Sequence, residues 1–168
     1  MTLNGTRQNS TMEHESSTGV ASAVTNEARI LIVGDDDVYE EQLKRTLAES
    51  GFVSENARSI TDGCNAAKSG RFQVVVSVPS MRDGSWQRLV DVANYYDLNF
   101  EVVLLARNFD PAECESALNH GAFDVLNVPN ELQNIGRVAT SAFWAAYLRG
   151  SGRLPRSLCK SQSIRSAA

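Results

Sequence analysis

The chain has 168 residues, of which 42% are apolar, and a formal net charge of −4. This size and composition are typical of one soluble domain built around one core. The apolar runs are too short to span a membrane, and the N-terminus lacks the basic start and apolar stretch of a secretory signal. The protein is therefore expected to be soluble and cytoplasmic.

Composition divides the chain into three parts. Residues 1–28 are rich in Ser, Thr, Asn and Gly without a periodic apolar pattern, which predicts a disordered leader. Residues 29–148 carry 17 acidic and 10 basic side chains and hold the periodic patterns of a folded domain. Residues 149–168 contain five basic side chains and no acidic one, and their glycines and proline should interrupt any helix. A basic, flexible tail is therefore expected there.

Short β-rich runs alternate with helical patterns along residues 29–148. In chain order we expect a strand at 29–33, a helix ending at Gly51, a weak strand at 52–57, a helix at 60–69 and a clear strand at 72–77. A helix from Trp86 to Ala93, a strand at 100–106, a helix from Pro111 to His120, a strand at 123–127 and a helix from Leu132 to Ala146 follow. Five such pairs predict an α/β fold with a doubly wound, parallel five-stranded sheet between two helical layers, as in flavodoxin-like sandwiches.

Several local patterns occur together in this folded segment. They are Asp35 and Asp36 after the first strand, Gly51-Phe52 after the first helix, Pro79 followed by Asp83-Gly84, and Gly121-Ala122-Phe123-Asp124 followed by Pro129. In this order and spacing the segment resembles the receiver domain of two-component response regulators. The resemblance implies a (βα)5 fold whose cleft lies at the carboxyl ends of the strands. In that family a carboxylate after the third strand takes a phosphoryl group, acids after the first strand hold Mg²⁺, and a hydroxyl and a lysine bind the product.

This chain departs from the family's pattern where the chemistry is carried. Ser77 or Val78 stands at the phosphoacceptor position, Leu105 at that of the hydroxyl, Val128 at that of the lysine, and Val125 at that of an aromatic residue in the fifth strand. The resemblance therefore implies a degenerate receiver, or pseudo-receiver, that is not phosphorylated on aspartate. We expect no catalytic residue and no enzymatic activity.

The aspartates leave two questions open. Asp36 or Asp37 is expected to cap the following helix, and the alternative is a weak Mg²⁺ site at Asp35 and Asp36, the one cofactor that the sequence suggests. Asp83 is the alternative phosphoacceptor, a displaced carboxylate that would make the chain an atypical phospho-accepting regulator. Its Asp-Gly setting favours a turn instead.

The expected function is that of a stand-alone signalling module in a two-component, phosphorelay type of system. It would act by protein–protein interaction with a sensor kinase, a regulator or another signalling protein, or as a homodimer. The residues expected at the interface are of types enriched in binding hot spots, namely Phe123, Arg137, Trp144 and Tyr147. The alternative from another class is a small flavodoxin-like ligand-binding or enzymatic domain, although a Gly-rich phosphate loop is lacking after the first strand. The acidic core argues against nucleic-acid binding, except weakly through the basic tail.

Overall fold

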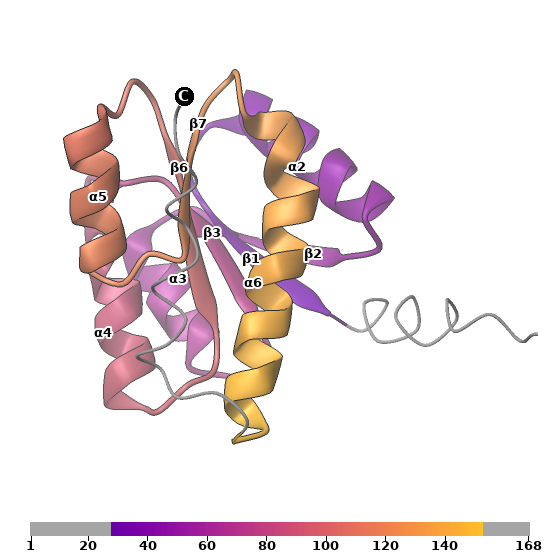
Figure 1. The fold of residues 1–168 in the computed structure, drawn as a ribbon, viewed down its shortest axis with the longest axis vertical. Coiled ribbons are helices and arrows are strands. Elements are labelled where there is room, and N and C mark those ends of the chain that lie inside the picture. Colours follow the sequence, from indigo (N-terminus) through magenta and orange to yellow (C-terminus); the bar gives the residue numbers. More distant parts are fainter. Residues whose placement is uncertain (1–27, 153–168) are drawn as a thin grey trace, which may run out of the picture.

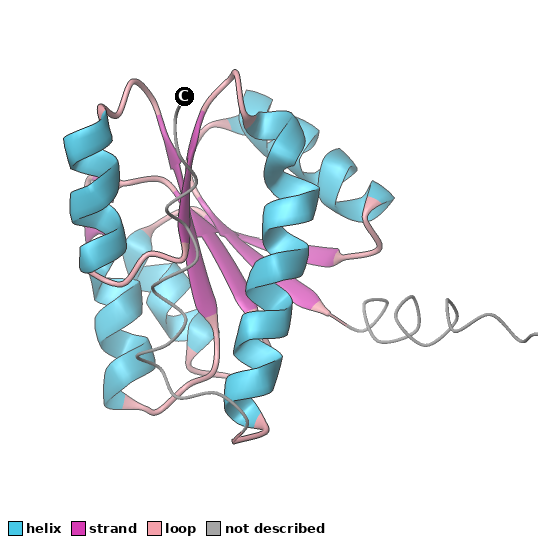
Figure 2. Cartoon of the chain, in the orientation of Figure 1, coloured by secondary structure: helices cyan, strands magenta, loops and turns pink. Residues whose placement is uncertain are grey.

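The computed structural model describes residues 28–152, which form a five-stranded parallel sheet between two layers of helices (Figures 1 and 2). The strands are β1 (Arg29–Val33), β2 (Val53–Ala57), β3 (Val74–Ser77), β6 (Glu101–Ala106) and β7 (Asp124–Asn127). Their order across the sheet is β2-β1-β3-β6-β7, so the direction of winding reverses between β1 and β3. The predicted doubly wound α/β fold is confirmed.

The two faces of the sheet carry different helices. Helices α2 (Asp37–Glu49) and α6 (Ile135–Gly150) cover one face, and α3 (Ile60–Ala67), α4 (Gln87–Tyr95) and α5 (Pro111–Asn119) cover the other (Figure 1). Ile30 and Ile32 face α2 and α6, whereas Leu31 and Val33 face the opposite layer. Successive side chains of a strand point to opposite faces, so a strand buried on both sides is a continuous apolar run. This explains why β1, β3 and β6 were the clearest strands in the sequence.

Helix starts follow capping chemistry that the sequence carries. Asp36 accepts a hydrogen bond from the amide of Val38 at the start of α2. At the start of α5, Asp110 and Glu113 form a reciprocal capping box, with Pro111 at the first helical position. The predicted start of a helix at Asp110-Pro111 is therefore confirmed, and each cap fixes the path of a loop at the carboxyl edge of the sheet.

Two features differ from the predictions. A short antiparallel hairpin of β4 (Ser80–Met81) and β5 (Gly84–Ser85) follows β3, where a loop was expected, because two-residue strands leave no periodic signal. The last helix, after a 3-10 turn at Leu132–Asn134, continues to Gly150. The boundary placed at residue 148 is therefore two residues too early, and Arg149, which was assigned to the basic tail, belongs to α6.

Arg149 stays in the helix because it forms a buried ion pair with Glu101 at the start of β6. The predictions of a disordered leader and, beyond Gly152, of a flexible tail concern residues that lie outside the described part of the chain. Among residues 28–152, none of the helices is long and apolar enough to cross a membrane.

Candidate functional site

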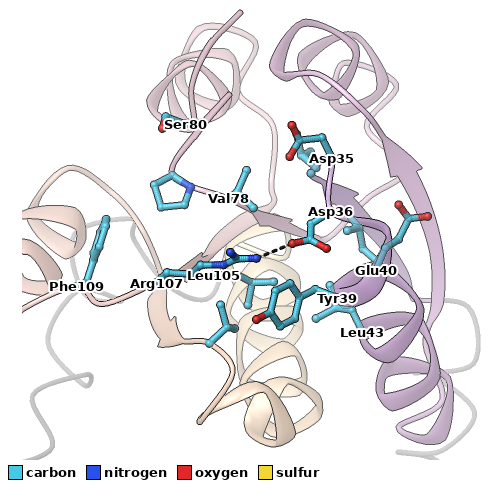
Figure 3. Close-up of a pocket in the computed structure, with 15 residues that line it drawn as sticks. Asp35, Asp36, Tyr39, Glu40, Leu43, Val78, Ser80, Leu105, Arg107 and Phe109 are labelled. Carbon is cyan, nitrogen blue, oxygen red and sulfur yellow. Dashed lines mark hydrogen bonds and ion pairs between the residues drawn. The ribbon is translucent and has the colours of Figure 1, made fainter. Parts of the chain in front are cut away.

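A pocket of about 450 Å³ opens at the carboxyl edge of the sheet, where β1, β3 and β6 end (Figure 3). This edge, next to the reversal of strand order between β1 and β3, is where open α/β sheets bind ligands. The residues that line it are Ile32, Val33, Gly34, Asp35, Asp36, Tyr39, Glu40, Leu43, Val78, Pro79, Ser80, Leu105, Arg107, Phe109 and Val128.

The apolar part of the pocket combines three residues from three strand ends. Val78 follows β3, Leu105 lies in β6 and Val128 follows β7, and all three line the same cavity. The family resemblance gave Val78 as one of two candidates for the position of the acceptor carboxylate, and it placed the hydroxyl at Leu105 and the lysine at Val128. The fold thus brings the three positions together as that resemblance implies, and in this chain they form an apolar surface.

The structure distinguishes the two residues considered for the acceptor position. Ser77 is fully buried, does not line the pocket, and its hydroxyl donates to the carbonyl oxygen of Val78 at 2.9 Å. Val78 instead lines the pocket. Val125 is also absent from the pocket lining, since it packs against the core on the α3–α5 side.

Asp36 and Arg107 form an ion pair across the pocket (Figure 3). Arg107 Nη2 lies 2.5 Å from Asp36 Oδ2, and the guanidinium stacks 4.8 Å from the centre of the Tyr39 ring. The other carboxylate oxygen of Asp36 accepts the capping hydrogen bond from Val38 at 3.1 Å. Both oxygens of Asp36 are therefore engaged, and the side chain connects the β1–α2 loop to the residues that follow β6. The expectation that Asp36 caps the helix is confirmed.

The side chains at this edge do not fit a divalent cation. Mg²⁺ requires near-octahedral oxygen ligation, usually by one or two carboxylates and several waters. Asp36 already binds an amide and a guanidinium, and Val78 offers no side-chain oxygen. Within residues 28–152, no three side chains of the metal-binding types gather in one place. The expected weak Mg²⁺ site at Asp35 and Asp36 thus lacks a sufficient set of ligands.

Asp83, the alternative phosphoacceptor, performs a structural task away from the pocket. It lies in the turn of the β4–β5 hairpin, and its two carboxylate oxygens accept the amides of Ile60 at 3.1 Å and Thr61 at 2.7 Å. Hydrogen bonds from the side chain and amide of Thr61, together with that from Ile60, lower the pKa of Asp83 to about 2. The carboxylate stabilises the first turn of α3 and does not line the pocket. The interpretation of Asp83-Gly84 as a turn is confirmed.

Sequence reasoning missed the residues that complete the pocket. Arg107, Tyr39, Phe109 and Ser80 all line it, and none of them was predicted as a site residue. The available signal was a basic residue immediately after the strand at 100–106. Its position after a strand matches that of the three aspartates after the first strand, and its charge is opposite to theirs. Asp36 and Arg107 are 71 residues apart, so only the sheet order makes them partners.

The four residues expected at an interface lie away from the pocket, on or near α6. Trp144 and Tyr147 are in edge-to-face contact with ring centres 5.7 Å apart, and 49% of Tyr147 is exposed. Arg137 is exposed two helical turns before Trp144, on the same side of the helix. Phe123 and Trp144 are half-buried against the core on the α2–α6 side. Arg137, Trp144 and Tyr147 therefore form a polar and aromatic strip along α6, which we call the α6 strip.

Strand order, helical layers and the site at the switch point define this chain as a receiver-like member of the flavodoxin-like α/β folds. Solved receiver domains share the architecture. The chain is similar to the signal receiver domain of a putative LuxO repressor protein from Vibrio parahaemolyticus, with a TM-score of 0.68 and 16% identity over 77% of this chain and 99% of that one. A response regulator receiver domain protein from Clostridium thermocellum gives a TM-score of 0.63 and 22% identity, over 73% of this chain and 98% of that one.

The beryllofluoride-activated NtrC4 receiver domain dimer gives a TM-score of 0.60 and 20% identity, over 68% of this chain and 98% of that one. The sequence matches no family model and no curated protein. At these identities the likeness shows the fold, which is that of response regulator receiver domains.

Proposed function

We propose that this chain is a receiver-like signalling module of a two-component type of system that is not phosphorylated on aspartate and acts by binding another protein. The observation that carries the proposal is the apolar surface of Val78, Leu105 and Val128 at the three positions that would perform phosphoryl chemistry.

Phosphoryl transfer to a carboxylate needs a nucleophile, a cation that offsets the charge repulsion, and donors that bind the product. Here the pocket presents Val78 where the nucleophile would stand, and the exposed acid Asp35 in its lining would repel a phosphoryl group. The positive charge of Arg107 is already paired with Asp36. A phosphoryl dianion beside the apolar surface would lose its hydration without gaining hydrogen bonds, which is strongly unfavourable.

The test is incubation of the full chain with Mg²⁺ and either acetyl phosphate or beryllofluoride, followed by intact mass and amide NMR spectra. We expect neither an added phosphoryl mass nor shifts at the pocket, and the same result for an Asp35→Asn/Asp36→Asn variant. A labile phosphoryl adduct would refute the proposal. An Asp83→Asn variant would then show whether the displaced carboxylate is the acceptor.

The binding half of the proposal rests on the α6 strip. Tryptophan, tyrosine and arginine are the residues most enriched in binding hot spots, and this strip offers all three on one side of a helix. One structural neighbour is described as a receiver domain dimer, which supports self-association as one form of the interaction. A sensor kinase, a regulator or another signalling protein is the other class of partner.

A Trp144→Ala/Tyr147→Ala variant tests this surface. The matched control is Tyr95→Ala/Tyr96→Ala, which removes two aromatic rings at the end of α4 that are 82% and 51% exposed. Sedimentation of the purified chain measures self-association, and cross-linking in the cells of origin followed by mass spectrometry locates partner contacts. We expect the α6 variant to lose at least about 30-fold in affinity, because a hot spot contributes about 2 kcal/mol or more, and the control to keep it. If both variants fold and bind equally well, the strip is not the interface.

The pocket favours a second candidate function, that of a small-molecule-binding domain. Its volume lies within the range of known ligand sites. An enzymatic reaction gains no such support, because the hydroxyl of Ser77 is buried and bound to the carbonyl of Val78.

A further inference from the structure

We propose that the pocket at the carboxyl edge of the sheet binds a small amphipathic amine, with an aromatic or branched aliphatic body and a charged ammonium group. This assigns a ligand to the receiver-like module and gives it an input other than phosphorylation. Only that signalling role rests on the proposed function, because binding of the amine is a property of the pocket itself.

The shape and lining of the pocket favour an apolar body. Its volume of about 450 Å³ falls within the roughly 300–1,000 Å³ of sites that take small molecules. Val78, Leu105 and Val128 supply an apolar surface from three strand ends, and Tyr39 and Phe109 add aromatic walls. Removing an apolar group from water onto such a surface is favourable and needs no directional partner.

The charges at the mouth select the polar group of the ligand. Three acids line the pocket, and two of them are already neutralised. Asp36 pairs with Arg107, and Glu40 pairs with Lys44 at 2.7 Å. Asp35 is exposed and forms no ion pair within residues 28–152, so the uncompensated charge of the lining is negative.

An anionic ligand would meet two obstacles at this mouth. It would face the repulsion of Asp35, and it would have to compete with Asp36 for Arg107. An ammonium group meets neither obstacle. In Figure 3, Asp35, Val78 and Ser80 lie on one side of the Asp36–Arg107 pair, so a ligand against Val78 would have the carboxylate and a hydroxyl beside it.

Three probes that share a phenylethyl body and differ in charge test the proposal: phenethylamine, phenethyl alcohol and 3-phenylpropionate. Amide NMR titrations of the full chain at pH 7 report affinity and location together. We expect shifts centred on Gly34, Val78 and Leu105, with the amine binding about three- to fivefold more tightly than the alcohol, as one ion pair in water allows. The carboxylate should bind more weakly than the alcohol.

Two variants locate the contributions. Asp35→Asn should remove the preference for the amine without changing the affinity for the alcohol, while Asp91→Asn, an exposed acid on α4, should change neither. Gly34→Leu should block all three probes. A Cβ at Gly34 would lie 3.6 Å from Val78 Cγ1, an ordinary contact, so the larger side chain extends from a tolerated position into the cavity.

The midpoint of urea unfolding shows whether each variant folds. If Gly34→Leu does not fold, Gly34→Ala replaces it, and a partial loss of binding is expected for that smaller side chain. Absence of localised shifts with the amine, equal affinity for the amine and the carboxylate, or a preference that survives Asp35→Asn would overturn the proposal. The phosphorylation test is made without the three phenylethyl compounds, and its deciding result is the mass of a phosphoryl adduct, so each idea fails on its own measurement.

Discussion

Glu101 and Arg149 offer the sharpest test of how α6 is held on the sheet. Glu101 begins β6 and Arg149 lies in the last turn of α6, and their ion-paired side chains are only 7% and 10% exposed. Arg149 also donates to the carbonyl oxygen of Phe100 at 3.5 Å. Substituting either residue by Ala would remove this ion pair from a buried site, at a cost of about 3–5 kcal/mol. For a domain whose unfolding free energy is about 5–15 kcal/mol, this is a large fraction.

Urea unfolding followed by far-ultraviolet circular dichroism measures the loss. The control is Glu55→Ala, another strand glutamate, which is 33% exposed and pairs with Arg29 and Arg71 at the surface. Its cost should stay near 0–1 kcal/mol per pair, or about 2 kcal/mol at most. Replacing both buried charges, Glu101→Leu/Arg149→Met, should recover much of the stability that either single change removes.

The reasoning would be refuted if Glu101→Ala and Arg149→Ala cost no more than Glu55→Ala. That result would mean that water reaches the pair in solution. The same experiment bears on the proposed interface, because the pair anchors the end of α6, which carries Trp144 and Tyr147.

Asp36→Ala should lower the unfolding free energy by about 0.5–2 kcal/mol, the scale of a lost helix cap. The neighbouring Asp37→Ala, which removes no cap, should cost less in the same urea titration. Asp83 has a pKa of about 2 in the fold against an ordinary 3.8, so its stabilising effect is complete above pH 4 and is lost as the pH falls toward 2. Asp83→Asn should therefore flatten the decline in stability measured between pH 4 and 2, and an unchanged slope would contradict this. Gly63→Ala would place a Cβ 2.8 Å from Val33 Cγ2, an overpacking expected to cost about 1–3 kcal/mol, and adding Val33→Ala should recover part of the loss in melting temperature.

Much of the fold could be predicted because its local signals agree with one another. Val74, Val75 and Val76 are all fully buried, since helices cover both faces of β3, and such a strand is an unbroken apolar run. The weakest expected strand became β2 (Val53–Ala57), an edge strand paired only with β1. Its side chains are mostly half-exposed, which is why its pattern was faint. The hairpin of β4 and β5 was missed because its strands are too short to show alternation.

The candidate site, like the fold, could be predicted from the sequence in part only. The residue types at the strand ends included no carboxylate after the third strand and no hydroxyl or lysine at the other two positions that the resemblance singled out, and a parallel sheet necessarily brings such ends to one edge. The sequence could not choose between Ser77 and Val78, because a shift of one residue reverses the face to which a side chain points. It also could not show that Asp83 stabilises α3 or that Arg149 belongs to the fold.

The sequence by itself therefore determined the class of fold and the position of the cleft, because both depend on which residue types follow which strand. Only the tertiary structure decided which side chains line the cleft and how their charges pair. Arg107 meets Asp36 across 71 residues of chain, neutralises it, and leaves Asp35 as the open charge beside an apolar surface. Such a pairing depends on strand order and side-chain direction, which local periodicity does not encode.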